Sequence, residues 1–293
     1  MRYMMDFTTN TTKNKWYRSR NFYRAIHNKR LTMGTILVFV ILIFAVFAPL
    51  IAPEEIFSID FKSRLAHPSA EHILGCDDFG RDLFSRIVYG SRVSLIVGLI
   101  SQLVAMTMGT ALGMVAGYYG NIIDNIIMRI MDVFFSFPSL LLAIALMTAF
   151  GTNLSNIILA IGIVYTPQFA RIVRGSVLSI KEKEFIESAK AQGMSDLRLI
   201  LKHLFPNIMG PIVIYATMGI GDAILTEAGL SFLGLGIQPP TPSWGGMLSN
   251  GKNFISVAPF EVIFAGIAIV LTVLAFNTLG DGIRDYLDPK QNQ

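Results

Sequence analysis

The sequence predicts an all-α protein that crosses a membrane several times. Of its 293 residues, 53% are apolar and only 15% are charged, whereas a soluble domain carries roughly 25% charged residues. The apolar residues gather in blocks of about 20 to 25 residues, the length that a helix needs to cross about 30 Å of hydrocarbon. The blocks lack the alternation of membrane barrel strands. Helices satisfy their own backbone polar groups in lipid, so each block is expected to be helical.

Six apolar blocks define six predicted transmembrane helices. In the second block, Ala105, Gly109, Gly113 and Gly117 recur every four residues, so they share one helix face and predict close contact with another helix. Each of three prolines predicts a kink or an end of its helix: Pro138, Pro167 and Pro211. The six blocks are residues 32–52, 93–117, 126–150, 155–175, 208–233 and 257–280.

The basic residues predict that both termini lie in the cytoplasm. Lys and Arg concentrate in residues 1–31 and 176–207, and cytoplasmic segments of membrane proteins carry an excess of these residues. Because they flank apolar blocks, the net charge of +4 predicts contact with the lipid bilayer and no nucleic acid binding. We expect a multi-pass protein of the cytoplasmic membrane. Its parts are a cytoplasmic basic tail (1–31), the first helix with an extracytoplasmic loop (32–92), a core of five helices (93–283) and a cytoplasmic tail (284–293).

The longest inner segment predicts a helix-turn-helix outside the membrane. Two short amphipathic stretches, 183–192 and 196–205, are separated by Gly193, which suits a helix end that needs a positive φ. Ser195 is placed to cap the second helix, and Pro206 is expected to end it. Such a projection has a suitable shape for docking a partner protein.

Acidic residues within apolar blocks are costly and face protein or water. Asp222 and Glu227 lie well inside the fifth block, which contains no Lys or Arg. They are candidates for a substrate pathway or a gate, and polar contacts at a helix interface or near the outer surface are the alternative. Arg129 and Asp132, three residues apart in the third block, predict a local ion pair.

The outer loop is long for a connection and rich in charge. Asp77, Asp78, Arg81 and Asp82 indicate an ordered polar element. It is a candidate for contact with an extracytoplasmic protein or for sealing a pathway, with structural packing as the alternative.

No sequence pattern indicates a catalytic or metal site. The chain lacks Gly-x4-Gly-Lys-Ser/Thr, His-Glu-x-x-His and Gly-x-Ser-x-Gly motifs. His67 and His72 have no evident third ligand, so they are expected to be surface residues. Cys76 is the single cysteine and cannot form an internal disulfide. We expect no catalytic residue, no metal and no cofactor on this chain, and no enzyme activity of its own.

The spacing of residues in the inner loop matches a known pattern. Glu187, Ser188 and Ala189, followed by Gly193 and Pro206, resemble the Glu-Ala-Ala ("EAA") loop of ABC importer permeases. In that family the pattern is Glu-Ala-Ala, three residues, Gly, nine residues, Ile, any residue, Leu and Pro. Ser188 replaces the first Ala, and the Ile and Leu places are also changed, but the spacing from Glu to Gly to Pro is intact.

Longer segments extend the resemblance over nearly the whole chain. They resemble the C-type permease of dipeptide, oligopeptide and nickel importers, and they are residues 74–94, 131–143, 229–248 and 277–290. The resemblance implies the fold of a type I ABC importer permease. It also implies that the EAA-type loop seats on one of two ATPase subunits, which hydrolyse ATP with Mg²⁺. A second, homologous permease would complete a heterodimer, and an extracytoplasmic binding protein would deliver the substrate.

The expected function is ATP-driven import of short peptides by alternating access. A nickel or metallophore importer is the alternative, because such permeases share this architecture. A more remote alternative is an ion-coupled secondary transporter that uses Asp222 and Glu227 as titrating groups. A membrane enzyme is disfavoured by the missing catalytic motifs.

Overall fold

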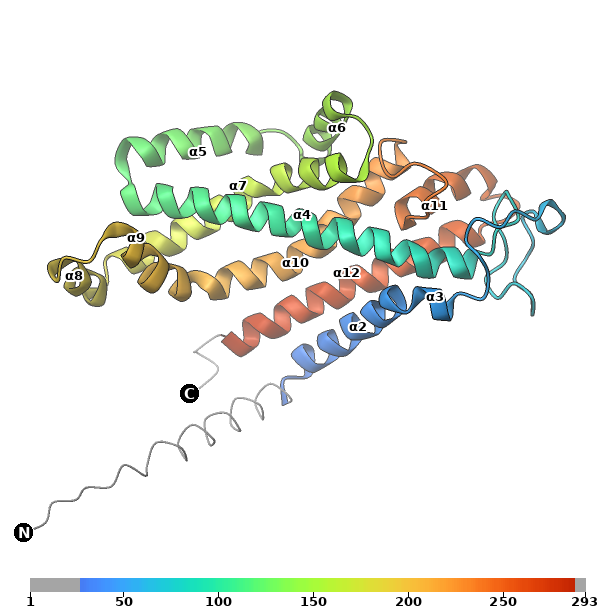
Figure 1. Ribbon diagram of the computed structural model, residues 1–293, viewed down its shortest axis with the longest axis horizontal. Coiled ribbons are helices and arrows are strands. Elements are labelled where there is room, and N and C mark those ends of the chain that lie inside the picture. The colour runs from blue at the N-terminus through green and yellow to red at the C-terminus, as the bar shows by residue number, and fades with distance from the viewer. Residues whose placement is uncertain (1–26, 288–293) are drawn as a thin grey trace, which may run out of the picture.

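The computed structural model describes residues 27–287, which form an elongated bundle of helices and contain no β-strand (Figure 1). Residues 1–26 of the predicted basic tail and residues 288–293 lie outside the described part. Five helices are long and apolar enough to cross a membrane. They are α2 (Lys29–Val46), α4 (Leu83–Tyr119), α7 (Leu154–Lys181), α10 (Phe205–Phe232) and α12 (Phe260–Leu287).

The third predicted span is broken into two helices. α5 (Asn121–Phe135) and α6 (Ser139–Phe150) meet at an angle of 92°. Pro138 has no backbone N–H and disfavours a helical conformation in the residue before it, so α5 cannot continue through it. The predicted kink or helix end at Pro138 is therefore confirmed, and residues 27–287 contain six spans only if the bent pair counts as one.

α4 begins at Leu83, well before the predicted start of the second span at 93. Asp82 lies at its N-cap and accepts a hydrogen bond from the Ser85 N–H at 2.7 Å. The first turns are polar, so hydropathy alone placed them in the loop. The expected boundary between the outer-loop part (32–92) and the helical core (93–283) thus falls inside α4. The shorter elements are α3 (Ala48–Ile51), η1 (Phe61–Ser63), α8 (Glu184–Ala191), α9 (Asp196–Leu199), η2 (Ile200–Leu204), α11 (Trp244–Gly251) and η3 (Lys252–Phe254).

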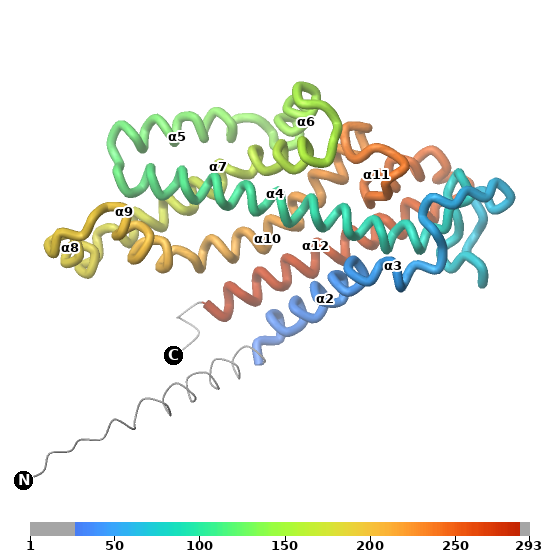
Figure 2. Tube along the Cα trace, viewed as in Figure 1, coloured from blue at the N-terminus to red at the C-terminus, as the bar shows by residue number. Residues whose placement is uncertain are grey.

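The two ends of the bundle differ. The start of α2 and the end of α12 run side by side (Figure 2), joined by an Arg30–Asp285 ion pair at 3.3 Å. The helices α8 and α9 extend at this same end, and the loop between α3 and α4 lies at the opposite end. Both ends of the described chain therefore lie on the same side as the predicted helix-turn-helix.

α4 and α7 pack at backbone distance, which confirms the predicted contact face of small residues. A Cβ atom added at Gly109 would lie 2.7 Å from the carbonyl oxygen of Thr166, and one added at Gly113 would lie 2.9 Å from Cβ of Val173. Ala105 is fully buried on the same face. Small residues allow such close approach between helices in lipid.

Two arginines of α7 hold α5. Arg174 makes hydrogen bonds of 2.5 and 2.6 Å to the two carboxylate oxygens of Asp124. Arg171 pairs with Asp132 at 2.8 Å. Asp132 therefore pairs across helices, and no ion pair joins it to Arg129 in the described part of the chain. The predicted local pair is wrong because a cation from the neighbouring helix reaches the carboxylate.

Another arginine satisfies the backbone where α2 ends. Pro49 has no N–H to bond to the Ala45 carbonyl oxygen. Arg92 of α4 donates to that oxygen at 2.5 Å and to the Val46 carbonyl oxygen at 2.7 Å. The side chain thus replaces backbone bonds and attaches α2 to α4.

We predict that Gly113→Ala destabilises the protein although alanine favours helix. The new methyl group would meet the Ala170 carbonyl oxygen and Val173 across the α4–α7 contact, and overpacking costs about 1–3 kcal/mol. Gly175→Ala on α7 is the control, because open space surrounds its added Cβ. The thermal midpoint in detergent should fall for Gly113→Ala and stay or rise for Gly175→Ala. Equal midpoints for the two variants would show that the contact does not need glycine.

Candidate functional site

The candidate coupling site is the helix-turn-helix that precedes α10. In α8, Ile186 and Ala189 are buried against the bundle, whereas Glu187 and Ser188 are exposed. The apolar side of α8 thus fixes the helix to the protein and leaves the first two positions of the EAA-type pattern on the surface. The third position, Ala189, is part of the core.

Gly193 makes the predicted turn. Its φ of +77° lies in the left-handed region, which glycine adopts without a steric penalty. Its N–H donates to the Lys190 carbonyl oxygen at 2.9 Å, and the Met194 N–H donates to the Ala189 carbonyl oxygen at 3.2 Å. This pair of bonds is the Schellman motif that closes a helix C-terminus.

The second half of the site differs from the prediction. Ser195 occupies the N-cap of α9 without a capping hydrogen bond from its side chain. The chain then passes through the π-helical turn η2 directly into α10, so Pro206 lies in the first turn of α10 and does not end a helix. Pro206 has no N–H to donate to the turn before it. The Phe205 N–H bonds to the Ile200 carbonyl oxygen, five residues back, as a π turn requires.

Contacts to the end of α4 anchor this projection. The Tyr118 hydroxyl donates to Asp196 at 2.6 Å. Lys181 donates to the Gly117 carbonyl oxygen at 3.4 Å, and Lys190 lies over the Tyr118 ring at 5.5 Å. These residues were missed by the sequence reasoning, because nothing in the sequence signals a hydrogen bond between positions 78 residues apart.

Three large apolar side chains of the site face outward. Phe185 is 41% exposed, Leu197 is 68% exposed and Leu201 is 55% exposed. They belong to α8, α9 and η2, at the end of the bundle that extends beyond the long helices. Exposed apolar side chains in this segment are candidates for contact with a partner protein.

The two acidic residues of α10 are not a pair. Asp222 is exposed, and its carbonyl oxygen accepts a bond from the Tyr165 hydroxyl at 3.2 Å. Glu227 is fully buried and accepts a bond from the Ser231 hydroxyl at 2.7 Å. Its second carboxylate oxygen has no hydrogen-bond partner. The structure thus gives one acid an open face and encloses the other beside α11.

The charged residues of the outer loop form a compact cluster. Asp77 accepts bonds from the Arg81 N–H at 3.0 Å and from its guanidinium at 2.6 Å, and Arg86 approaches the same carboxylate at 3.4 Å. Asp77, Arg81 and Asp82 are buried within this chain. Asp78 is only partly buried, and burial together with the Asp77 charge raises its pKa.

Cys76 lies in the same loop and is buried. Burial, reinforced by the neighbouring Asp82 and Glu54 carboxylates, raises the pKa of its thiol to about 12. The thiol therefore remains protonated near neutral pH, and a protonated thiol is a poor nucleophile.

Two small cavities lie where helices end or break. One, of about 190 Å³, is at the α5–α6 break and is lined by Phe134, Phe137 and Gln168 among others. The other, of about 170 Å³, lies between α11 and the segment after α10, with Arg86 and Gln238 in its wall. Polar atoms line much of both walls, so neither cavity has the mostly apolar lining that is usual for a small-molecule site.

Comparisons with known proteins agree with this architecture. The model of the family described as "Binding-protein-dependent transport system inner membrane component" matches residues 109–293. The chain is 51% identical over 263 residues to the dipeptide transport system permease protein DppC of Alkalihalophilus pseudofirmus, covering 90% of this chain and 86% of that protein. It is 44% identical over 273 residues to the glutathione transport system permease protein GsiD of Pectobacterium atrosepticum, covering 92% and 91%.

A solved structure shares the fold. A chain of the inward-facing MetNI methionine ABC transporter superposes with a TM-score of 0.57 at 18% identity, and the match covers 69% of this chain and 97% of that one. The expected type I permease fold is confirmed by this likeness. From the family match and the identities to the two permeases, the chain belongs to the family of inner membrane components of binding-protein-dependent transport systems.

Proposed function

We propose that this chain is the translocation subunit of an ATP-driven importer of short peptides. The observation that carries the proposal is the sequence similarity of this chain to a permease named for dipeptide transport. The two are 51% identical over 90% of this chain. A relative named for transport of glutathione, itself a small peptide, supports the same substrate class. Import of nickel or a metal chelate is the alternative, and the uptake experiment below separates the two.

The helix-turn-helix is the proposed attachment point for an ATPase subunit. Glu187, Ser188 and the apolar side chains of Phe185, Leu197 and Leu201 form its exposed surface. Burying this surface in a groove of the ATPase would remove apolar area from water. Two ATPase subunits would hydrolyse ATP with Mg²⁺, and the permease chain itself would bind neither of these.

A second permease of similar fold would pack against the open side of α5. This helix buries only Met131, and it presents Ile122, Ile126 and Val133 with more than half of their surface exposed. Asp222, on the exposed face of α10, would line the pathway between the two permeases. Glu227 would act at a distance from the substrate by holding α11 in place.

An extracytoplasmic binding protein would deliver the peptide to the end of the bundle that carries the outer loop. Because Asp77, Arg81 and Asp82 are buried, they would shape the loop, and Asp78 and exposed neighbours would make the contact. This assignment places the two termini and the helix-turn-helix in the cytoplasm.

Uptake measurements test the substrate. Cells that lack the gene should lose uptake of a labelled dipeptide and keep uptake of nickel, and restoring the gene should restore the peptide uptake. Removing the ATPase genes should have the same effect. Loss of nickel uptake alone would move the function to metal import, and peptide uptake without the ATPases would contradict ATP-driven transport.

Substitutions at Gly193 test the coupling role. Gly193→Val should cut transport strongly, since a β-branched residue is strained at a φ of +77°. Gly193→Asn should keep most activity, because asparagine tolerates this conformation. No side chain or backbone lies within 4 Å of an added Cβ, so the two variants differ in backbone strain and not in crowding. Membrane insertion and ATPase copurification are measured alongside, and equal transport by both variants would refute the role of the turn.

Cysteine labelling tests the orientation. The buried, protonated Cys76 should not react with a membrane-impermeant maleimide in intact cells near pH 7, which leaves a silent background. Ser58→Cys in the outer loop should then be labelled from outside, and Ser188→Cys only after permeabilisation; both serines are exposed. The reverse pattern would invert the proposed topology, and labelling of the unmodified chain would contradict the burial of Cys76.

A further inference from the structure

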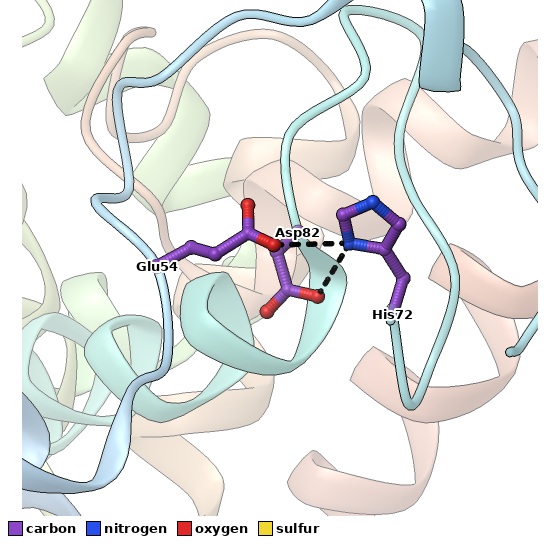
Figure 3. Close-up of side chains that lie close together, drawn as sticks. All are labelled: Glu54, His72 and Asp82. Carbon is purple, nitrogen blue, oxygen red and sulfur yellow. Dashed lines mark ion pairs between the residues drawn. The ribbon is translucent and has the colours of Figure 1, made fainter. Parts of the chain in front are cut away.

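Three side chains of the outer loop converge on one point. Nδ1 of His72 lies 3.2 Å from Oε1 of Glu54 and 3.4 Å from Oδ1 of Asp82 (Figure 3). The three ligand atoms all lie within 4.8 Å of one another. The sequence alone indicates no further ligands for His72, because the three residues are far apart along the chain. Glu54 follows α3, His72 lies in the loop, and Asp82 lies at the start of α4.

The distances suit a shared cation. In a tetrahedral Zn²⁺ site, bonds of about 2.0–2.2 Å place neighbouring ligand atoms about 3.3–3.6 Å apart. The two distances from the His72 nitrogen are close to this range. The Glu54 side chain is 36% exposed, so it can move to close the remaining gap to Asp82.

Hydrogen bonding does not account for the arrangement. Nδ1 of His72 and Oδ1 of Asp82 are both buried, and neither has a hydrogen-bond partner. The Asp82 side chain is only 1% exposed and points its free oxygen at the histidine. Buried polar atoms normally have a hydrogen-bond partner, and a bound ion can take the place of that partner.

The local charge also favours a cation. Among residues 27–287, Glu54 and Asp82 have no ion pair with Lys or Arg, since Arg81 and Arg86 pair with Asp77. Two carboxylates and a neutral imidazole would balance a divalent ion. The two carboxylates share one histidine as their ion-pair partner, and a divalent ion would offset their mutual repulsion more fully than a single positive charge.

Each ligand is held in place by its backbone. The second oxygen of Asp82 caps α4 through the Ser85 N–H, and the Ser85 hydroxyl accepts a bond from the Glu54 N–H at 3.2 Å. The His72 N–H donates to the Ser69 hydroxyl at 3.1 Å. Prior positioning of this kind lowers the cost of assembling a metal site.

We propose that Glu54, His72 and Asp82 form a binding site for a divalent transition metal ion, Zn²⁺ in the first place. One imidazole and two carboxylates suit Zn²⁺ better than Mg²⁺ or Ca²⁺, which prefer oxygen ligands alone. Water would take the fourth position. The bound ion would tie the outer loop to the start of α4, and the proposal does not depend on which substrate is transported.

Co²⁺ titration tests the site, because four-coordinate Co²⁺ reports its ligands by visible absorption. The full chain is purified with the subunits that accompany it and freed of metal with EDTA. We expect one Co²⁺ per chain at this site, displaced by Zn²⁺. His72→Asn and Glu54→Gln should each weaken binding by at least about tenfold, a loss that even outer-shell changes can cause.

His67→Asn is the matched control. Its ring packs against Phe260 at 5.1 Å between centroids, so its removal should leave Co²⁺ binding unchanged. Glu54→Gln decides the result if His72→Asn does not fold, because Glu54 is partly exposed. Equal Co²⁺ binding by the unmodified chain and by the folded variants would overturn the proposal. The cluster would then be an ion pair of His72 with Glu54 and Asp82.

Discussion

The approach of α4 to α7 at backbone distance is the constraint on which the rest of the structure depends. Apolar side chains gain little by leaving lipid, so helices in a membrane associate through close packing and polar bonds. Gly109 and Gly113 leave no room for a Cβ against Thr166 and Val173. This contact fixes the central helix, and the helix carries Asp82 at one end and Tyr118 at the other. The outer loop and the helix-turn-helix are therefore both built on one element.

Polar side chains bring order where close packing is absent. α5 buries a single residue, Met131, and two ion pairs join it to α7, Arg171 with Asp132 and Arg174 with Asp124. Such bonds are directional, so they set the rotation of α5 while they leave its apolar face open. An open apolar face on a helix that is otherwise fixed is suited to a second subunit.

The sequence predicts the number and order of the apolar segments because hydrophobic length is a local property. It also predicts the Gly193 turn, since a helix end with a positive φ selects glycine. The sequence does not predict contacts between residues that are far apart along the chain. Asp132 pairs with Arg171 and not with Arg129, and Asp196 accepts a hydrogen bond from Tyr118. Pro206 was misassigned because a proline that ends one helix and one that begins the next look alike in sequence. The grouping of His72 with Glu54 and Asp82 likewise depends on the folded loop.

The proposed coupling has two routes from the helix-turn-helix into the membrane. One is covalent: η2 joins α9 to α10 without a break, and a π turn is a weak point in the backbone ladder where a helix bends readily. The other is the Tyr118–Asp196 hydrogen bond to α4, with 2.6 Å between the two oxygens. A π turn can absorb part of a movement by bending, whereas α4 is a continuous helix of 37 residues, about 55 Å long. A displacement that enters α4 is therefore carried to the outer loop, and one that enters α10 is partly lost in bending. In the proposed importer, a movement of the helix-turn-helix therefore reaches the outer loop mainly through the Tyr118–Asp196 bond to α4.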